Sequence, residues 1–132
     1  MDPNSEKPTE RPKVLVVDDD FDILAMLGRL LRRMDFEVHE AADGEEALRL
    51  VRSIRPRLVI LDVMMPKMSG WEVCRAIRED PSIADTRVLM LTGIGERLNE
   101  MTSPLYGADD FIDKPFDVDD FKARVLALIG ER

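Results

Sequence analysis

The stretch V-L-V-V-D-D-D at Val14–Asp20 joins a short apolar run to three acidic residues. Consecutive Val and Leu residues without polar alternation are typical of a strand that is buried on both faces, as in parallel sheets. Two more apolar runs have this character, and two weaker segments also favour strands. Together these segments predict five strands, at Val14–Val17, Phe36–Ala41, Leu58–Leu61, Val88–Leu91 and Asp110–Asp113.

Helical patterns separate the predicted strands. Apolar residues recur with a period near 3.6 in several segments, beginning at Ile23, Ala47, Val73 and Phe121. Alternating strands and helices predict an α/β fold with a parallel sheet. Right-handed crossovers favour a doubly wound, flavodoxin-like (βα)5 single domain with a five-stranded sheet in the order 2-1-3-4-5.

Composition narrows the class of protein. A length of 132 residues allows one domain, which we place at residues 13–132 after a proline-rich, disordered tail at residues 1–12. The net charge of -8 argues against direct binding of nucleic acid or of an anionic membrane. A single cysteine, Cys74, excludes a disulfide framework, and no apolar run approaches the about 18 residues that span a bilayer. A cytoplasmic location is the simplest expectation.

Chemically complementary groups follow the predicted strands. Asp18, Asp19 and Asp62 supply carboxylates, whereas Thr92 and Lys114 supply a hydroxyl and an ammonium group. Each group alone has an ordinary explanation as a turn, cap or surface residue. In the 2-1-3-4-5 order they converge, and a divalent cation would relieve the repulsion between the carboxylates. Oxygen-only ligands favour Mg²⁺, and the hydroxyl and lysine suit a phosphoryl group.

Four motifs make the chain similar to a known family. They are V-L-V-V-D-D-D at Val14–Asp20, L-V-I-L-D-V-M-M-P-K-M-S-G at Leu58–Gly70, L-T-G at Leu91–Gly93, and G-A-D-D-F-I-D-K-P-F at Gly107–Phe116. In this order and spacing, the chain resembles the CheY-like receiver domain of two-component response regulators. The resemblance covers Lys13 to about Ile129.

The resemblance implies a phosphoacceptor site with Mg²⁺. Asp62 would accept a phosphoryl group from a histidine kinase, and its carboxylate needs no general base because it is ionised at pH 7. Asp19 would bind the metal directly, Asp18 mainly through water, and Met64 through its backbone carbonyl. Such a domain is a signalling switch, not an enzyme beyond its own phosphorylation and dephosphorylation.

The resemblance also implies a switch and its partners. Thr92 and Lys114 would contact phosphoryl oxygens. In this family the peptide bond at Lys114-Pro115 is typically cis, which directs the lysine into the site. Phe111 matches the aromatic switch position. The surface formed by the fourth helix, the fifth strand and the last helix would then change. The implied partners are a sensor histidine kinase or phosphotransfer protein and a downstream effector protein or domain.

Departures from the family concern the fourth helix, expected between Gly95 and about Tyr106. Pro104 cannot continue a helix, so a short or irregular helix is expected there. Asp109, Asp110 and Arg124 fit the charge pairs of the family's usual dimer. The expected helix lacks their usual charged partners, which leaves the oligomeric state open.

Competing classes are less consistent with the residues. A pseudo-receiver that binds partners without phosphorylation usually lacks one of the acids, the threonine or the lysine, all of which this chain keeps. A phosphatase of the haloacid dehalogenase type needs an acid where Met64 stands. In a flavodoxin, the acids at Asp18–Asp20 would repel the flavin phosphate.

Overall fold

The computed structural model describes residues 11–93 and 107–130. The strands are β1 (Lys13–Val17), β2 (Glu37–Ala41), β3 (Leu58–Asp62), β4 (Arg87–Thr92) and β5 (Asp110–Asp113). The helices are α1 (Phe21–Arg33), α2 (Gly44–Ile54), α3 (Gly70–Glu79) and α5 (Val118–Gly130). The helix expected near Pro104 lies outside the described residues, as do residues 1–10 of the expected tail.

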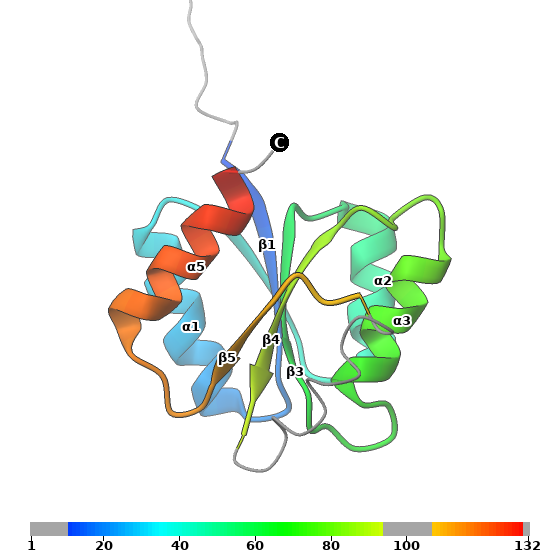
Figure 1. The fold of residues 1–132 in the computed structure, drawn as a ribbon, viewed down its shortest axis with the longest axis horizontal. Helices are drawn as coiled ribbons and strands as arrows, with labels where there is room; N and C mark the ends of the chain where they lie inside the picture. The colour runs from blue at the N-terminus through cyan, green and yellow to red at the C-terminus, as the bar shows by residue number, and fades with distance from the viewer. Residues whose placement is uncertain (1–10, 94–106, 131–132) are drawn as a thin grey trace, which may run out of the picture.

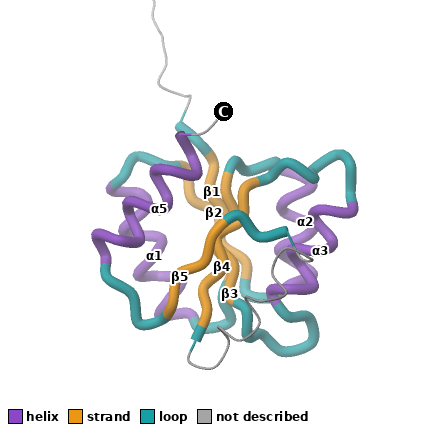
Figure 2. Tube along the Cα trace, viewed as in Figure 1, coloured by secondary structure: helices purple, strands orange, loops and turns teal. Residues whose placement is uncertain are grey.

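The five strands form one parallel sheet in the order β2-β1-β3-β4-β5, which confirms the predicted topology. Figure 1 shows the sheet between two pairs of helices, with α1 and α5 on one face and α2 and α3 on the other. The tube in Figure 2 shows the same three layers. The chain is therefore a doubly wound α/β domain.

Strand side chains alternate between two separate cores. Leu15 and Val17 of β1 face the core under α2 and α3, whereas Val14 and Val16 face the core under α1 and α5. Both sets are fully buried. This two-sided burial is the physical reason for the uninterrupted apolar runs in the sequence.

Most predicted boundaries are confirmed to within one residue. Asp20 caps α1 and Asp43 caps α2, each accepting hydrogen bonds from backbone N–H groups of the first turn. The strands β3 and β4 run one residue further than predicted, so Asp62 and Thr92 are their last residues. Both site residues are thus fixed by the backbone hydrogen bonds of the sheet.

Candidate phosphoacceptor site

Strand register brings the acids of β1 and β3 to one level. Val17 is paired with Leu61 in the sheet. Asp18, which follows β1, and Asp62, the last residue of β3, therefore lie side by side. One oxygen from each of Asp18, Asp19 and Asp62 lies within 4.8 Å of the others. The predicted convergence of these carboxylates at the carboxyl end of the sheet is therefore found in the structure.

Burial distinguishes the three acids. Asp62 is 3% exposed and Asp18 is 1% exposed, whereas Asp19 faces solvent. Burial raises the pKa of Asp62 to about 6, and the neighbouring carboxylate of Asp18 acts in the same direction. Burial also raises the pKa of Asp18. The site thus holds anionic groups in a setting that disfavours their charge.

Lys114 is the cation that faces these acids. Its Nζ lies 2.9 Å from Asp62 Oδ1 and 3.4 Å from Asp18 Oδ2, and the Lys114-Pro115 peptide bond is cis as expected. Partial burial lowers the pKa of Lys114, but the hydrogen bond and charge of Asp62, with Asp18, outweigh this and raise it. Lys114 therefore remains charged beside the carboxylates.

The third acid of the motif has a structural role. Asp20 Oδ1 accepts a hydrogen bond of 2.9 Å from the Asp22 N–H, at the N-terminus of α1. Its own N–H donates to Asp18 Oδ1 at 3.0 Å. Asp20 thereby orients the Asp18 carboxylate, and the interpretation of Asp20 as part of the helix cap is confirmed.

Thr92 and Phe111 lie on the strands β4 and β5, and their side chains contact residues other than the three acids. The buried hydroxyl of Thr92 donates to Asp113 Oδ1 at 2.6 Å, on the neighbouring strand β5. The ring of Phe111 lies 5.7 Å from that of Trp71, centroid to centroid, at 45° between planes. The sequence did not identify Asp113 or Trp71 as these partners. An acid at the end of a strand and a tryptophan in a helix are common, so neither residue signals a particular contact.

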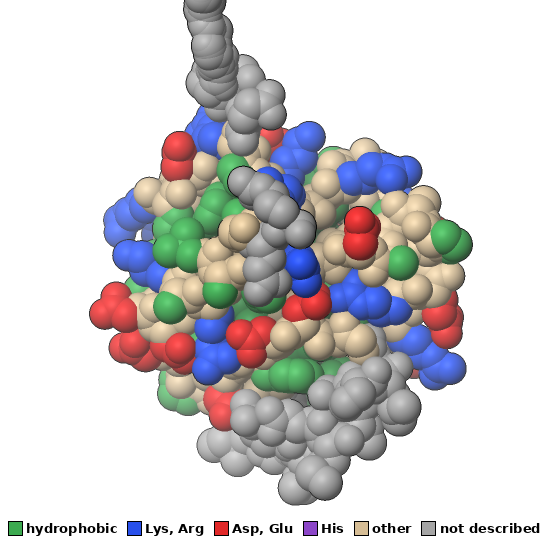
Figure 3. Space-filling model, turned by 45° about the horizontal axis from the view of Figure 1, so that its top comes forward, with side chains coloured by type: hydrophobic (Ala, Val, Ile, Leu, Met, Phe, Trp, Pro, Cys, Tyr) green, Lys and Arg blue, Asp and Glu red, His purple; other side chains and the backbone are tan. Residues whose placement is uncertain are grey.

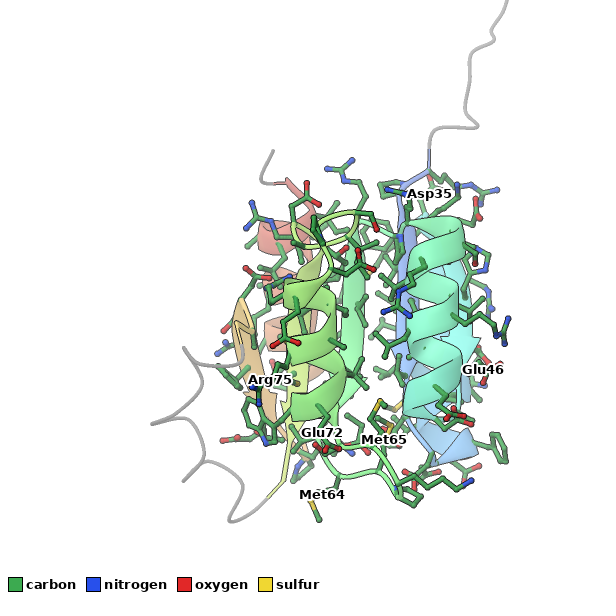
Figure 4. All side chains as sticks on the ribbon, turned by 90° about the vertical axis from the view of Figure 1, so that its right-hand side faces the viewer. Asp35, Glu46, Met64, Met65, Glu72 and Arg75 are labelled. Atoms are coloured by element: carbon green, nitrogen blue, oxygen red, sulfur yellow. The ribbon has the colours of Figure 1, made fainter. Side chains whose placement is uncertain are left out.

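The loop after β3 depends on a glycine. A Cβ added to Gly70 would lie 2.3 Å from the backbone oxygen of Asp62, a contact that no side chain can make. Figure 4 shows Met64 at the end of the molecule opposite Asp35, and the Met64 side chain is exposed. The glycine requirement could have been read from the motif, because an N-terminal helix glycine close to a strand end often marks close backbone approach.

The charged residues assigned to the family's dimer are paired within the chain. Arg124 donates to Asp110 Oδ1 at 2.8 Å and to Asp120 Oδ1 at 3.1 Å. Asp109 Oδ2 accepts from Arg78 at 2.8 Å and from the Val88 N–H at 2.7 Å. Asp109 thus links β4 to α3 through these two hydrogen bonds.

A family model for the response regulator receiver domain matches residues 14–126. The chain belongs to this family. A receiver domain is a signalling switch and not a conventional enzyme. Among the described residues, no helix is long and apolar enough to cross a membrane.

Curated relatives are similar over most of this receiver domain. Identity is 41% over 119 residues with ycf27 of Cyanophora paradoxa, covering 90% of this chain and 48% of the relative. It is 39% over 118 residues with RpaA of Synechocystis, a DNA-binding master transcriptional regulator, covering 89% of this chain and 49% of RpaA. The receiver domain spans about half the length of these relatives.

Solved structures share the fold. Chemotaxis protein CheY4 of Vibrio cholerae is 33% identical with a TM-score of 0.83, over 89% of this chain and 98% of CheY4. The receiver domain of sensor histidine kinase PA1611 from Pseudomonas aeruginosa, solved with magnesium in its active-site cleft, is 22% identical with a TM-score of 0.83. It covers 92% of this chain and 99% of that chain.

Proposed function

We propose that this receiver domain accepts a phosphoryl group on Asp62 and passes on the signal by a change of surface. The observation that carries the proposal is the position of the Asp62 carboxylate. It is buried beside Asp18, within reach of Asp19, and bonded to Lys114 at 2.9 Å. A nucleophilic carboxylate, an acidic pocket and a fixed cation are the parts that phosphoryl transfer needs.

The reaction is a displacement at phosphorus. An Asp62 oxygen forms a bond to the phosphorus of a phosphohistidine, and the phosphorus–nitrogen bond breaks with its electron pair returning to the imidazole. The product is an acyl phosphate on Asp62. Lys114 Nζ already contacts this carboxylate and is placed to pair with an oxygen of the transferred group.

The donor set fits a hard divalent cation. Three carboxylate oxygens within 4.8 Å of one another match the oxygen ligands of Mg²⁺. Asp18, Asp19 and Asp62 would hold the ion, together with the backbone carbonyl of Met64. When bound, Mg²⁺ neutralises negative charge on the phosphoryl group.

A switch can begin at the hydroxyl of Thr92. Its bond to Asp113 would be exchanged for a bond to a phosphoryl oxygen, which moves the end of β4. Phe111 of β5 is half-buried against Trp71 of α3 and would turn further inward. The surface that the family forms from β5, α5 and the helix expected between Gly95 and about Tyr106 would then present a different shape to an effector.

The partners proposed are a sensor histidine kinase or phosphotransfer protein and a downstream effector protein or domain. Residues 13–132 would form the receiver unit. RpaA is a DNA-binding regulator of about twice this length, so in such proteins other residues are available for DNA contact. The net charge of -8 supports a receiver that does not bind DNA itself.

Beryllofluoride, an analogue of the bound phosphoryl group, tests the proposal. With Mg²⁺ it should raise the melting temperature of the parent protein, because a ligand that binds the folded state stabilises it. Neither additive alone should give the full shift, and Asp62→Asn should give none beyond that of Mg²⁺. Equal shifts in parent and Asp62→Asn would refute the phosphoacceptor and favour a binding-only pseudo-receiver.

A further inference from the structure

A second concave site lies at the end of the domain opposite the acids. Its volume is about 620 Å³, within the range of small-molecule sites. The turn before β3, the loop before β4 and the last turn of α5 form its walls. We call it the arginine pocket after its lining, which includes Arg55, Arg57, Ser82, Thr86, Arg87 and Leu128.

Positive charge in the arginine pocket is poorly compensated. Within residues 11–93 and 107–130, no carboxylate lies within ion-pair distance of Arg55 or Arg57, whereas several other arginines of the domain have such partners. Arg87 lies 3.6 Å from Asp109. Asp85 is the acid in the lining. Figure 3 shows several Lys and Arg side chains along this upper end of the molecule. In a domain of net charge -8, this concentration of cations stands out.

Backbone carbonyls hold the two uncompensated guanidinium groups in place. Arg55 Nη1 donates to Ser82 O at 2.9 Å, and Arg57 Nη2 donates to Ile129 O at 2.6 Å. A guanidinium group has five N–H donors, so both groups keep donors for a ligand. Fixed guanidinium groups bind phosphate oxygens in pairs, with little loss of side-chain freedom on binding.

The other lining groups define the rest of the ligand. The hydroxyls of Ser82 and Thr86 donate elsewhere, to Asp80 Oδ1 and Ile83 O at 2.8 Å each, so they present acceptors at most. Apolar wall comes from Ile83 and Leu128, which are 2% and 7% exposed. A matching ligand therefore combines several anionic oxygens with a small apolar part.

We propose that the arginine pocket binds a nucleoside diphosphate or triphosphate, with its phosphates on the arginines and its base against the apolar wall. The pocket borders Arg57 and Arg87, just before or at the start of β3 and β4, whereas Asp62 and Thr92 end those strands. Each arginine lies five residues before the site residue on its strand, which separates the two ends by about 16 Å. Binding is thus independent of the proposed phosphorylation of Asp62.

Calorimetric titration of the full chain, in EDTA, tests the arginine pocket with ADP and with pyrophosphate as separate probes. ADP should bind at one saturable site and pyrophosphate more weakly. The double variant Arg55→Gln/Arg57→Gln should lose about tenfold or more in affinity. The control Arg29→Gln/Arg75→Gln removes the same charge from exposed positions on α1 and α3 and should bind as the parent does, as should Asp62→Asn.

Three results would overturn the proposal: no ADP binding at millimolar concentration, equal losses in both double variants, or displacement of ADP by duplex DNA. If the pocket variant fails to fold, Asp85→Asn provides the decision. Asp85 is exposed, and its substitution removes a negative charge from the lining. ADP should bind Asp85→Asn more tightly than the parent, and unchanged or weaker binding would contradict the site.

Discussion

The Thr92 hydroxyl donates to Asp113 at 2.6 Å and not to the Asp62 carboxylate. Thr92 and Asp113 are paired residues of the adjacent strands β4 and β5, and Thr92 is fully buried. A phosphoryl group on Asp62 would have to compete with Asp113 for this hydroxyl. The bond therefore stabilises the unphosphorylated arrangement.

Removal of the competing acceptor should favour the phosphorylated arrangement. In Asp113→Ala the Thr92 hydroxyl keeps only the longer contact to Ile112 O at 3.3 Å. Beryllofluoride should bind about threefold to tenfold more tightly, the equivalent of one hydrogen bond released from competition. Fluorescence of Trp71, the one tryptophan of the chain, can report binding through its contact with Phe111. Asp119→Ala removes an exposed acid from α5 as the control, and an equal effect there would contradict the role of Asp113.

The raised pKa of Asp62 predicts a pH-dependent stability of the metal-free protein. The pKa is about 6 in the folded state against an ordinary 3.8, so the folded state binds the proton more tightly than the unfolded chain does. This contribution to stability is present below pH 3.8 and is lost as pH rises through 6. At pH 7 in EDTA, Asp62→Asn should therefore be more stable than the parent by on the order of 1–3 kcal/mol.

Urea unfolding at pH 4.5 and pH 7.5 measures this difference. The advantage of Asp62→Asn should shrink at the lower pH, where Asp62 of the parent is protonated. An advantage that is equal at both values, or a variant less stable than the parent at pH 7.5, would show that the ionised carboxylate carries no such cost.

Lys114 should oppose the binding of Mg²⁺. Its ammonium group lies 2.9 Å from Asp62 and 3.4 Å from Asp18, so it already neutralises part of the charge that a cation would meet. Lys114→Met should tighten Mg²⁺ binding by about fivefold or more, since two charges about 4 Å apart interact by about 1 kcal/mol even in water. Lys122→Met on α5 is the matched control. Titration of Trp71 fluorescence gives both affinities, and weaker binding in Lys114→Met would refute the electrostatic account.

Substitution of Gly70 and of Gly130 by alanine should change the stability of the fold in opposite directions. The Cβ of Gly70→Ala would overlap the Asp62 backbone, whereas that of Gly130→Ala would meet nothing within 4 Å. Gly70→Ala should lose about 1–3 kcal/mol of stability or more, while Gly130→Ala, at the end of α5, should gain up to about 1 kcal/mol. Thermal unfolding compares the two. A stable Gly70→Ala would mean that the loop after β3 is less tightly fixed than the structure indicates.

Much of the fold is predictable because three of the strands, β1, β3 and β4, are buried on both faces. The runs at β1, β3 and β4 have no polar interruption, so they could not be confused with half-exposed strands. The site followed from residue type together with strand order, which placed Asp18 and Asp62 at the ends of the neighbouring strands β1 and β3. A prediction from residue type and strand order does not require the side-chain conformations to be known.

Other features depend on side-chain conformation and were not predictable. From its position at the end of β4, the Thr92 hydroxyl could bond toward β3 or toward β5. Only the side-chain conformation in the structure shows that it bonds to Asp113 of β5. The bonds that Asp109 accepts from Arg78 and from the Val88 N–H likewise could not be inferred from the sequence. The arginine pocket combines loops that lie far apart in the sequence, at Arg55 and Arg87.

Intact-mass analysis after treatment with acetyl phosphate and Mg²⁺ tests the central claim most directly. The parent should gain the mass of one phosphoryl group, and Asp62→Asn should gain none. Asp113→Asn, which keeps Asp62 and an acceptor for Thr92, should be modified as the parent is. Phosphorylation that persists in Asp62→Asn, or a parent that stays unmodified, would contradict the assignment of Asp62 as the phosphoacceptor.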